Sequence, residues 1–261
     1  MANFHTHIGF STMLGCGYAG MGYLCGAPAE SAVLAGGLCG VSGMLPDIDS
    51  DKGIPLRETM AFAAAVVPLL TVDRMQALGL TYEWIVLAGA ATYLIIRFGV
   101  AKLLAKYTVH RGMFHSIPAA LVFAGLAFLV TGCGRLELRY YKAGAVLLGY
   151  LSHLVLDEIY SVEFARGRFR LKRSFGTALK FWGRSLWANV STYSKLIVVA
   201  TAILSEPAIM DRLGTEPLLV IRSDWREAWE APFTQGASDG SATDGDKTIY
   251  DTARRLFDGW Q

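Results

Sequence analysis

The chain has 261 residues, of which 53% are hydrophobic and 18% are charged, and its formal net charge is only +2. A mean hydropathy of +0.37 excludes an ordinary soluble domain, while the polar C-terminal end excludes a chain that lies wholly inside a bilayer. We therefore expect a membrane-embedded domain over residues 1–205 and a polar, partly disordered tail over residues 206–261. The four cysteines lie singly in apolar segments, which favours buried thiols over disulfides.

Apolar runs predict an all-α bundle of about six membrane helices. The first run covers residues 8–26, and the second covers residues 28–45, with a proline at its start and another after its end. A third run, residues 60–72, is short and contains Pro68, so it is either kinked or only partly spanning. Residues 84–104 form a full span. Six glycines in the first two helices would allow a close approach of their backbones: Gly9, Gly17, Gly36, Gly37, Gly40 and Gly43.

Two further helices and one short run complete the predicted domain. Residues 117–132 form the fifth helix, with Ser116 as the expected N-cap, and residues 143–162 form the sixth. Residues 193–204 are apolar but short. They form an interfacial or reentrant helix, or the end of a seventh span that begins nearer residue 188.

The remaining segments are polar. Residues 166–184 carry seven Lys and Arg interleaved with aromatic residues, which attracts anionic lipid or simply marks the inner side of the membrane. We expect no nucleic-acid partner from this stretch. Residues 235–247 form a linker of Gly, Ser, Asp and Thr, and the apolar positions of residues 247–260 predict a short amphipathic helix.

All five histidines lie in three short polar clusters within this apolar sequence, and a fourth cluster holds carboxylates alone. The clusters are residues 5–7, 45–51, 110–115 and 153–158. Imidazole and carboxylate groups are costly at membrane depth, so their confinement to these clusters predicts a shared site. With six crossings, all four clusters emerge on one side of the membrane. That side carries twelve Lys and Arg against four on the other, which predicts a cytoplasmic site.

The best-defined pair is His153 and Asp157, which are four residues apart in a predicted helix. Both side chains leave one face of that helix, one turn apart. This spacing lets an imidazole and a carboxylate bind one metal ion, or lets the carboxylate orient the imidazole. A hydrogen bond that only stabilises the helix end is the alternative.

The other clusters are less specific when taken singly. His110 and His115 bracket a turn that would have to fold back at the start of a helix, and Arg111 between them is a candidate for binding a substrate phosphate. Asp47 and Asp49 would point the same way in an extended segment, which suits the bridging of two cations. Two interfacial histidines and a solvated acidic turn are the corresponding alternatives.

Taken together, the clusters predict a centre of one or two divalent ions. Nitrogen and oxygen ligands of this kind suit Zn²⁺, with Mn²⁺ or Fe²⁺ as alternatives. His5 lies beside the first candidate ligand but is more readily incidental. The predicted metal-binding residues are His7, Asp47, Asp49, His110, His115, His153 and Asp157.

The same motifs, in this order, resemble the YdjM-like family of predicted membrane-bound metal-dependent hydrolases of the bacterial inner membrane. The resemblance covers about residues 1–205 and is carried by four strings: Thr6-His7-Ile8-Gly9, Leu45-Pro46-Asp47-Ile48-Asp49, His110-Arg111-Gly112-Met113-Phe114-His115-Ser116 and Gly149-Tyr150-Leu151-Ser152-His153-Leu154-Val155-Leu156-Asp157. The family is distantly similar to the helical zinc phospholipase C and P1 nuclease group. The resemblance implies the same metal ligands and phosphoester hydrolysis, although Phe114 and the string after Asp157 depart from the family pattern and alter the expected substrate pocket.

We therefore expect an integral membrane hydrolase that acts on a phosphoester or lipid-like substrate through metal-activated water. Asp49 or Glu158 would act as general base, and Arg111 would stabilise charge on the substrate. A metal or proton transporter is the first alternative, because intramembrane His and Asp also mark ion pathways. Against it, the sequence offers no second polar station in the opposite half of the helices. A scaffold with a structural metal is the second alternative.

Overall fold

The computed structural model describes residues 4–49, 54–100, 102, 113–132, 135–165, 168–171, 179–183 and 185–214. Within these residues the protein is helical apart from one short hairpin, so the predicted helical membrane bundle is confirmed. Three helical stretches are long and apolar enough to cross a membrane: Leu56–Ala77, Tyr82–Val100 and Leu186–Leu204.

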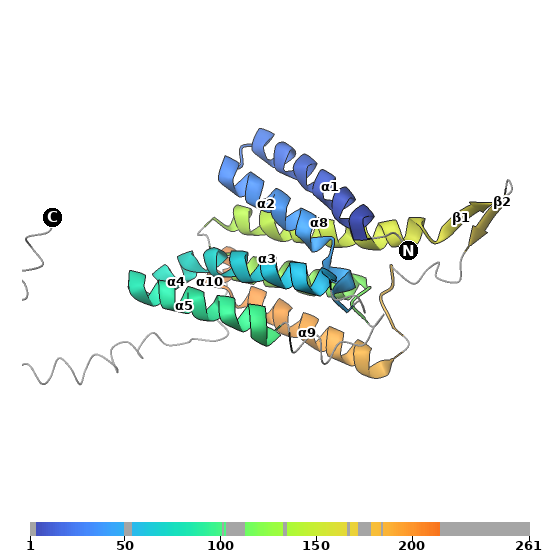
Figure 1. Ribbon diagram of the computed structural model, residues 1–261. Helices are drawn as coiled ribbons and strands as arrows, with labels where there is room; N and C mark the ends of the chain where they lie inside the picture. The colour runs from blue at the N-terminus through green and yellow to red at the C-terminus, as the bar shows by residue number, and fades with distance from the viewer. Residues whose placement is uncertain are drawn as a thin grey trace, which may run out of the picture. The chain divides into compact units, whose positions relative to one another are not determined.

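Three helices pack side by side: α1 (Phe4–Leu24), α2 (Ala29–Ser42) and α8 (Leu136–Ile159) (Figure 1). Glycines bring their backbones into contact. A Cβ atom on Gly15 would lie 2.4 Å from the Gly36 carbonyl oxygen, and a Cβ atom on Gly149 would lie 2.0 Å from the Cys39 carbonyl oxygen. Small residues play this role in membrane helices, because lipid supplies no hydrophobic force between them.

The glycine prediction was right for half of its six positions. Gly36, Gly40 and Gly43 lie against α1, whereas the three others, Gly9, Gly17 and Gly37, face open space. Gly15 and Gly22, which the sequence did not single out, make the close approaches on α1, to α2 and to α8 respectively.

The third predicted run belongs to a longer helical stretch than expected. α3 (Ile54–Leu70) contains Pro68, and a break at Thr71 separates it from α4 (Val72–Ala77). The Thr71 hydroxyl donates a hydrogen bond of 2.8 Å to the Pro68 carbonyl oxygen, which satisfies one of the backbone groups at the break. Asp73 and Arg74 end the apolar run but do not end the helix. The stretch is therefore long enough to cross.

The fourth predicted helix is α5 (Tyr82–Leu94), continued by the π-helical turn η2 (Ile95–Val100). α3 packs against both α5 and η2. None of the residues in α5 is buried, as expected for a helix that faces lipid.

Two of the helices after residue 113 begin after serine N-caps, Ser116 and Ser185. α7 (Ile117–Val130) begins after Ser116, whose hydroxyl accepts a hydrogen bond from the Ala119 amide, so the predicted N-cap is confirmed. α9 (Leu186–Leu204) packs against α7, and a Cβ atom on Gly125 would lie 2.4 Å from Val199. The short apolar run at 193–204 is thus the second part of a helix of spanning length.

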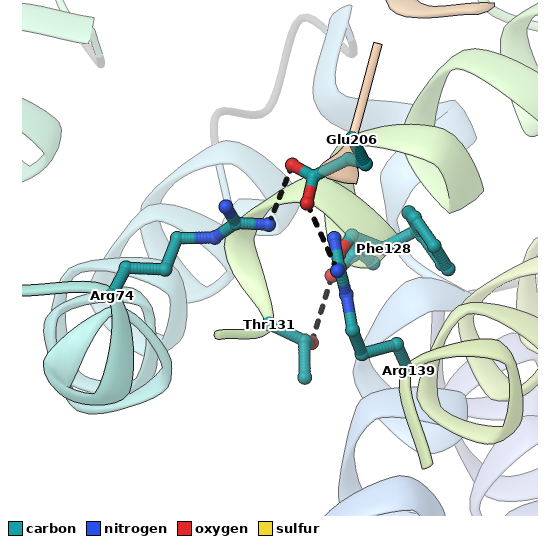
Figure 2. A network of polar contacts seen from close by, with 6 residues as sticks. Arg74, Phe128, Thr131, Arg139 and Glu206 are labelled. Carbon is teal, nitrogen blue, oxygen red and sulfur yellow. Dashed lines mark hydrogen bonds and ion pairs between the residues drawn. The ribbon is translucent and has the colours of Figure 1, made fainter. Parts of the chain in front are cut away.

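α8 begins seven residues earlier than predicted because it buries two basic residues, Arg139 and Lys142, in its first half. The Arg139 guanidinium donates to Glu206 over 3.0 Å and to the Phe128 carbonyl oxygen over 3.3 Å, while Arg74 donates to the other Glu206 carboxylate oxygen over 2.9 Å (Figure 2). We call these four residues the arginine–glutamate network. The expectation that the helices hold no second polar group in the half away from the predicted metal site was wrong.

Two short elements follow α8 and α9. β1 (Val162–Ala165) and β2 (Arg168–Leu171) form an antiparallel hairpin beyond the end of α8, in a region for which no strands were predicted (Figure 1). α10 (Pro207–Leu213) follows Glu206 and buries Ile209 and Met210 against the bundle. The predicted linker and tail helix lie outside the described residues.

Candidate metal centre

Five of the predicted ligands come together from four separate segments. His7 lies in the first turns of α1, Asp47 lies in the 3₁₀ helix η1 (Leu45–Asp49), and His115 lies just before α7. His153 and Asp157 lie one turn apart on α8. We call this set the His–Asp cluster. The three histidines and Asp157 are at most 6% exposed, and Asp47 is half-buried.

The two carboxylates lie between the imidazole rings. Asp47 Oδ1 is 3.3 Å from His115 Nε2 and 3.6 Å from His153 Nε2. Asp157 Oδ1 is 3.4 Å from His7 Nε2, and its other oxygen is 3.8 Å from His115 Nε2 and 3.7 Å from His153 Nε2. Each carboxylate therefore faces two or three imidazole nitrogens across gaps that are long for hydrogen bonds.

The donor atoms fall into two groups that share His153. His7, Asp47 and His153 form one group, and His115, His153 and Asp157 form the other, with the donor atoms of each within 4.8 Å of one another. Ligands about 2.0–2.1 Å from a tetrahedral zinc ion lie about 3.3 Å from one another. The observed separations are close to that value, so the donors are spaced to surround a cation.

The orientation of His153 is set by its other ring nitrogen. His153 Nδ1 lies 2.7 Å from the Gly43 carbonyl oxygen. A carbonyl oxygen can only accept, so Nδ1 carries the proton and the lone pair of the neutral ring is on Nε2, which faces both carboxylates. This carbonyl is available because α2 ends at Ser42, three residues before the predicted end of the second helix.

The cluster leaves buried polar atoms without hydrogen bonds. Within the described part of the chain, no hydrogen-bond partner is present for His7 Nδ1, for either ring nitrogen of His115, for His153 Nε2 or for Asp157 Oδ1. Buried polar atoms normally have partners, because an unsatisfied one costs about 1–3 kcal/mol. The His7 and His153 rings also stack, with centroids 3.7 Å apart. A divalent cation would satisfy these donors, so the residues fit a metal ion.

The segment that carries Asp47 is not extended. It is the 3₁₀ helix η1, in which positions i and i+2 lie about two-thirds of a turn apart. The expectation of an extended segment was therefore wrong, and the side chain of Asp49 lies outside the described residues. Burial raises the pKa of the Asp47 carboxyl, but the imidazoles of His115 and His153 together have a larger, opposite effect. The pKa of Asp47 therefore lies below its ordinary value.

The remaining predicted residues are not part of the His–Asp cluster as described. His110 and Arg111 lie outside the described residues. Glu158 is half-buried on α8 next to Asp157, but it belongs to neither donor group. His5 is exposed on α1, two residues from His7, as expected for an incidental histidine.

Three supporting residues were not assigned roles from the sequence. The Gly43 carbonyl orients His153, and Gly149 lets α8 approach α2 at the level of the cluster. The Tyr150 hydroxyl donates to the Phe114 carbonyl oxygen, which ties the segment of His115 to α8. The signal for the last two was present, because Gly149 and Tyr150 open the string that ends in His153 and Asp157.

The fold and this cluster define a polytopic helical membrane protein with a buried His/Asp site that could hold a metal ion. The chain matches the model of the YdjM inner membrane protein family over residues 1–204. It therefore belongs to that family, as the sequence motifs predicted. No curated protein and no solved structure is similar enough to count as a match.

Proposed function

We propose that this protein is an integral membrane metal-dependent hydrolase that acts on a phosphoester or lipid-like substrate at the cytoplasmic face of the inner membrane. The observation that supports it most is the His–Asp cluster, in which donors from four segments form two groups that share His153, and several of the donor atoms are buried without hydrogen bonds to described residues. Building such a group at membrane depth is costly, so it indicates function.

Five residues of the His–Asp cluster are the proposed metal ligands. His7, Asp47, His115, His153 and Asp157 would hold the metal, and the two Asp157 oxygens face different histidines. A bound Zn²⁺, Mn²⁺ or Fe²⁺ would supply Lewis acidity and lower the pKa of a water molecule.

The proton and charge roles fall to other residues. Glu158, next to Asp157, and Asp49, two residues from Asp47, are the candidates for general base. Arg111, between two of the candidate histidines in sequence, would bind the developing negative charge.

Phosphoester hydrolysis by the full-length protein in vesicles tests the proposal. Metal-loaded protein is expected to release phosphate or an alcohol from a phosphoester, and Asp49→Asn is expected to abolish turnover while it keeps the metal. Asp157→Asn is expected to lose both. If wild-type protein binds metal and hydrolyses nothing, the scaffold alternative holds.

The transporter alternative is tested in the same vesicles by metal flux. The arginine–glutamate network disfavours it, because near the first turns of α8 the guanidinium groups of Arg74 and Arg139 share the single carboxylate of Glu206, and the excess of positive charge repels cations. Metal flux that depends on His153 would replace the hydrolase proposal by the transporter.

A further inference from the structure

Large exposed apolar side chains gather immediately before and at the start of α9. Phe181, Trp182, Leu186 and Trp187 are between 60% and 80% exposed. The Trp182 ring also contacts the Tyr193 ring of α9, with centroids 5.3 Å apart. We call the described residues 179–183 and 185–187 the aromatic segment. A patch of this kind on one short segment marks an interaction surface.

The position of the aromatic segment indicates which surface it meets. It lies at the N-terminal end of α9, which is long and apolar enough to cross a membrane. The start of a spanning helix lies where hydrocarbon gives way to lipid head groups, and Trp and Tyr are enriched at that depth. The sequence around it is basic, with Lys172, Arg173, Lys180 and Arg184, which complements anionic lipid.

The backbone of the segment is held firmly. The Gly183 amide donates to Asn189 Oδ1 over 2.7 Å, and Asn189 Nδ2 donates back to the Gly183 carbonyl oxygen over 2.9 Å. Asn189 is only 1% exposed. The Tyr193 hydroxyl donates to the Phe181 carbonyl oxygen over 2.8 Å. These hydrogen bonds fix the backbone of the aromatic segment, which carries the exposed indole rings of Trp182 and Trp187.

The aromatic segment is also joined to the candidate metal centre. The Ile117 amide, two residues after His115, donates to the Lys180 carbonyl oxygen over 3.1 Å. On the other side of His115, the Met113 sulfur lies so close to Gly183 that a Cβ atom there would be 2.9 Å away. The depth of the aromatic segment in the membrane thus sets the depth of His115.

We propose that the aromatic segment binds the head-group region of the bilayer and holds the His–Asp cluster at that depth, so that the site takes an amphiphilic phospholipid-type substrate from the leaflet rather than a soluble phosphoester. The substrate class rests on the proposed hydrolase function. The membrane-binding role does not, because it follows from the position and exposure of the aromatic side chains.

Lipid quenching of tryptophan fluorescence tests the membrane-binding role. Full-length wild-type protein and the double variant Trp182→Phe/Trp187→Phe would be reconstituted in vesicles that carry a spin label either near the head group or near the chain end. The fluorescence lost in the double variant is expected to be quenched more strongly by the shallow label. If neither label quenches the fluorescence of Trp182 and Trp187, including the case in which a bound protein covers these side chains, the proposal is overturned.

Enzyme kinetics test the substrate class. Trp182→Ala/Trp187→Ala is expected to keep its metal content and to raise the KM for a long-chain phospholipid in vesicles about tenfold, with turnover of a short-chain soluble phosphoester unchanged. Trp84→Ala, which removes an exposed tryptophan of α5, serves as the matched control and should change neither. Equal loss on both substrates would overturn the inference. Absence of hydrolysis by wild-type protein would instead refute the proposed function, while the quenching result still decides the membrane-binding role.

Discussion

The first and second halves of α8 each carry a buried polar group, and the two groups are built differently. Arg139 and His153 are fourteen residues apart, which is about 21 Å along a helix. In the arginine–glutamate network, both Glu206 oxygens and the Arg139 guanidinium have protein partners (Figure 2). In the His–Asp cluster, several nitrogens and an oxygen have none among the described residues. The first is satisfied by protein groups except at Arg74 Nε, whereas the second leaves four ring nitrogens and one carboxylate oxygen without hydrogen bonds to described residues, as expected of a site that could hold a metal ion.

The difference predicts separate responses to mutation. Arg139→Ala would leave the Phe128 carbonyl oxygen and half of the Glu206 carboxylate without partners, so we expect a loss of about 3–5 kcal/mol in the free energy of unfolding with metal binding intact. Thermal unfolding in detergent, with metal analysis, measures both. Arg212→Ala, which breaks the exposed pair with Glu137 at the start of α8, should leave stability almost unchanged, because solvent screens that pair. Loss of metal in Arg139→Ala would show that the two groups are not independent.

A substitution between α2 and α8 should affect both stability and the metal centre. A methyl group on Gly149 would lie 2.0 Å from the Cys39 carbonyl oxygen and 2.1 Å from the Ser42 hydroxyl, so Gly149→Ala must move α8 away from α2. We expect a cost of about 3 kcal/mol and weaker metal binding, because His153 would lose its contact with the Gly43 carbonyl. Gly37→Ala, on the open side of α2, should have little effect. Equal stability of the two variants would refute the close packing.

Metal loading should stabilise the protein through the His–Asp cluster alone. At a free metal concentration of 100 times Kd, bound metal is expected to raise the free energy of unfolding by about 2.7 kcal/mol. A chelator titration followed by thermal unfolding measures it, and we expect the same gain in Arg139→Ala. The gain should fall at acidic pH, because imidazole ligands must be neutral to bind. An unchanged midpoint of unfolding on metal removal would contradict this account.

The smallest expected effect concerns helix packing next to the cluster. The Ser11 hydroxyl is fully buried and donates to the Gly40 carbonyl oxygen over 2.7 Å. Interhelical hydrogen bonds in membrane proteins contribute about 0.6 kcal/mol on average, so Ser11→Ala should lower stability by about that amount and leave metal binding unchanged. A loss as large as that of Gly149→Ala would mean that the contact is more than an ordinary hydrogen bond.

The sequence predicted the membrane helices and brought together His7, Asp47, His115, His153 and Asp157 because apolar runs and clustered polar residues obey strong physical constraints. The environment of lipid permits few conformations besides helices, and buried imidazoles need partners. The count of six crossings, which predicted that the clusters share one side of the membrane, stays a prediction, because three helical stretches of the described residues are long and apolar enough to cross.

Features that depend on contacts between distant residues were not predicted. Glu206 pairs with Arg74 and Arg139, which are 132 and 67 residues away in the sequence, so no local pattern predicts the network. The early start of α8 follows from that pairing, because a buried arginine ends an apolar run on a hydropathy scale. The 3₁₀ form of the Asp47 segment likewise depends on its packing.

The most direct measurement is the metal content of the purified full-length protein and of two matched histidine variants. His5 and His7 lie in the same turns of α1, but only His7 belongs to the cluster. We predict a stoichiometric divalent metal in the wild-type protein and in His5→Ala, and its loss in His7→Ala and His153→Ala. Equal metal content in all four proteins, or none in the wild type after loading, would contradict the account.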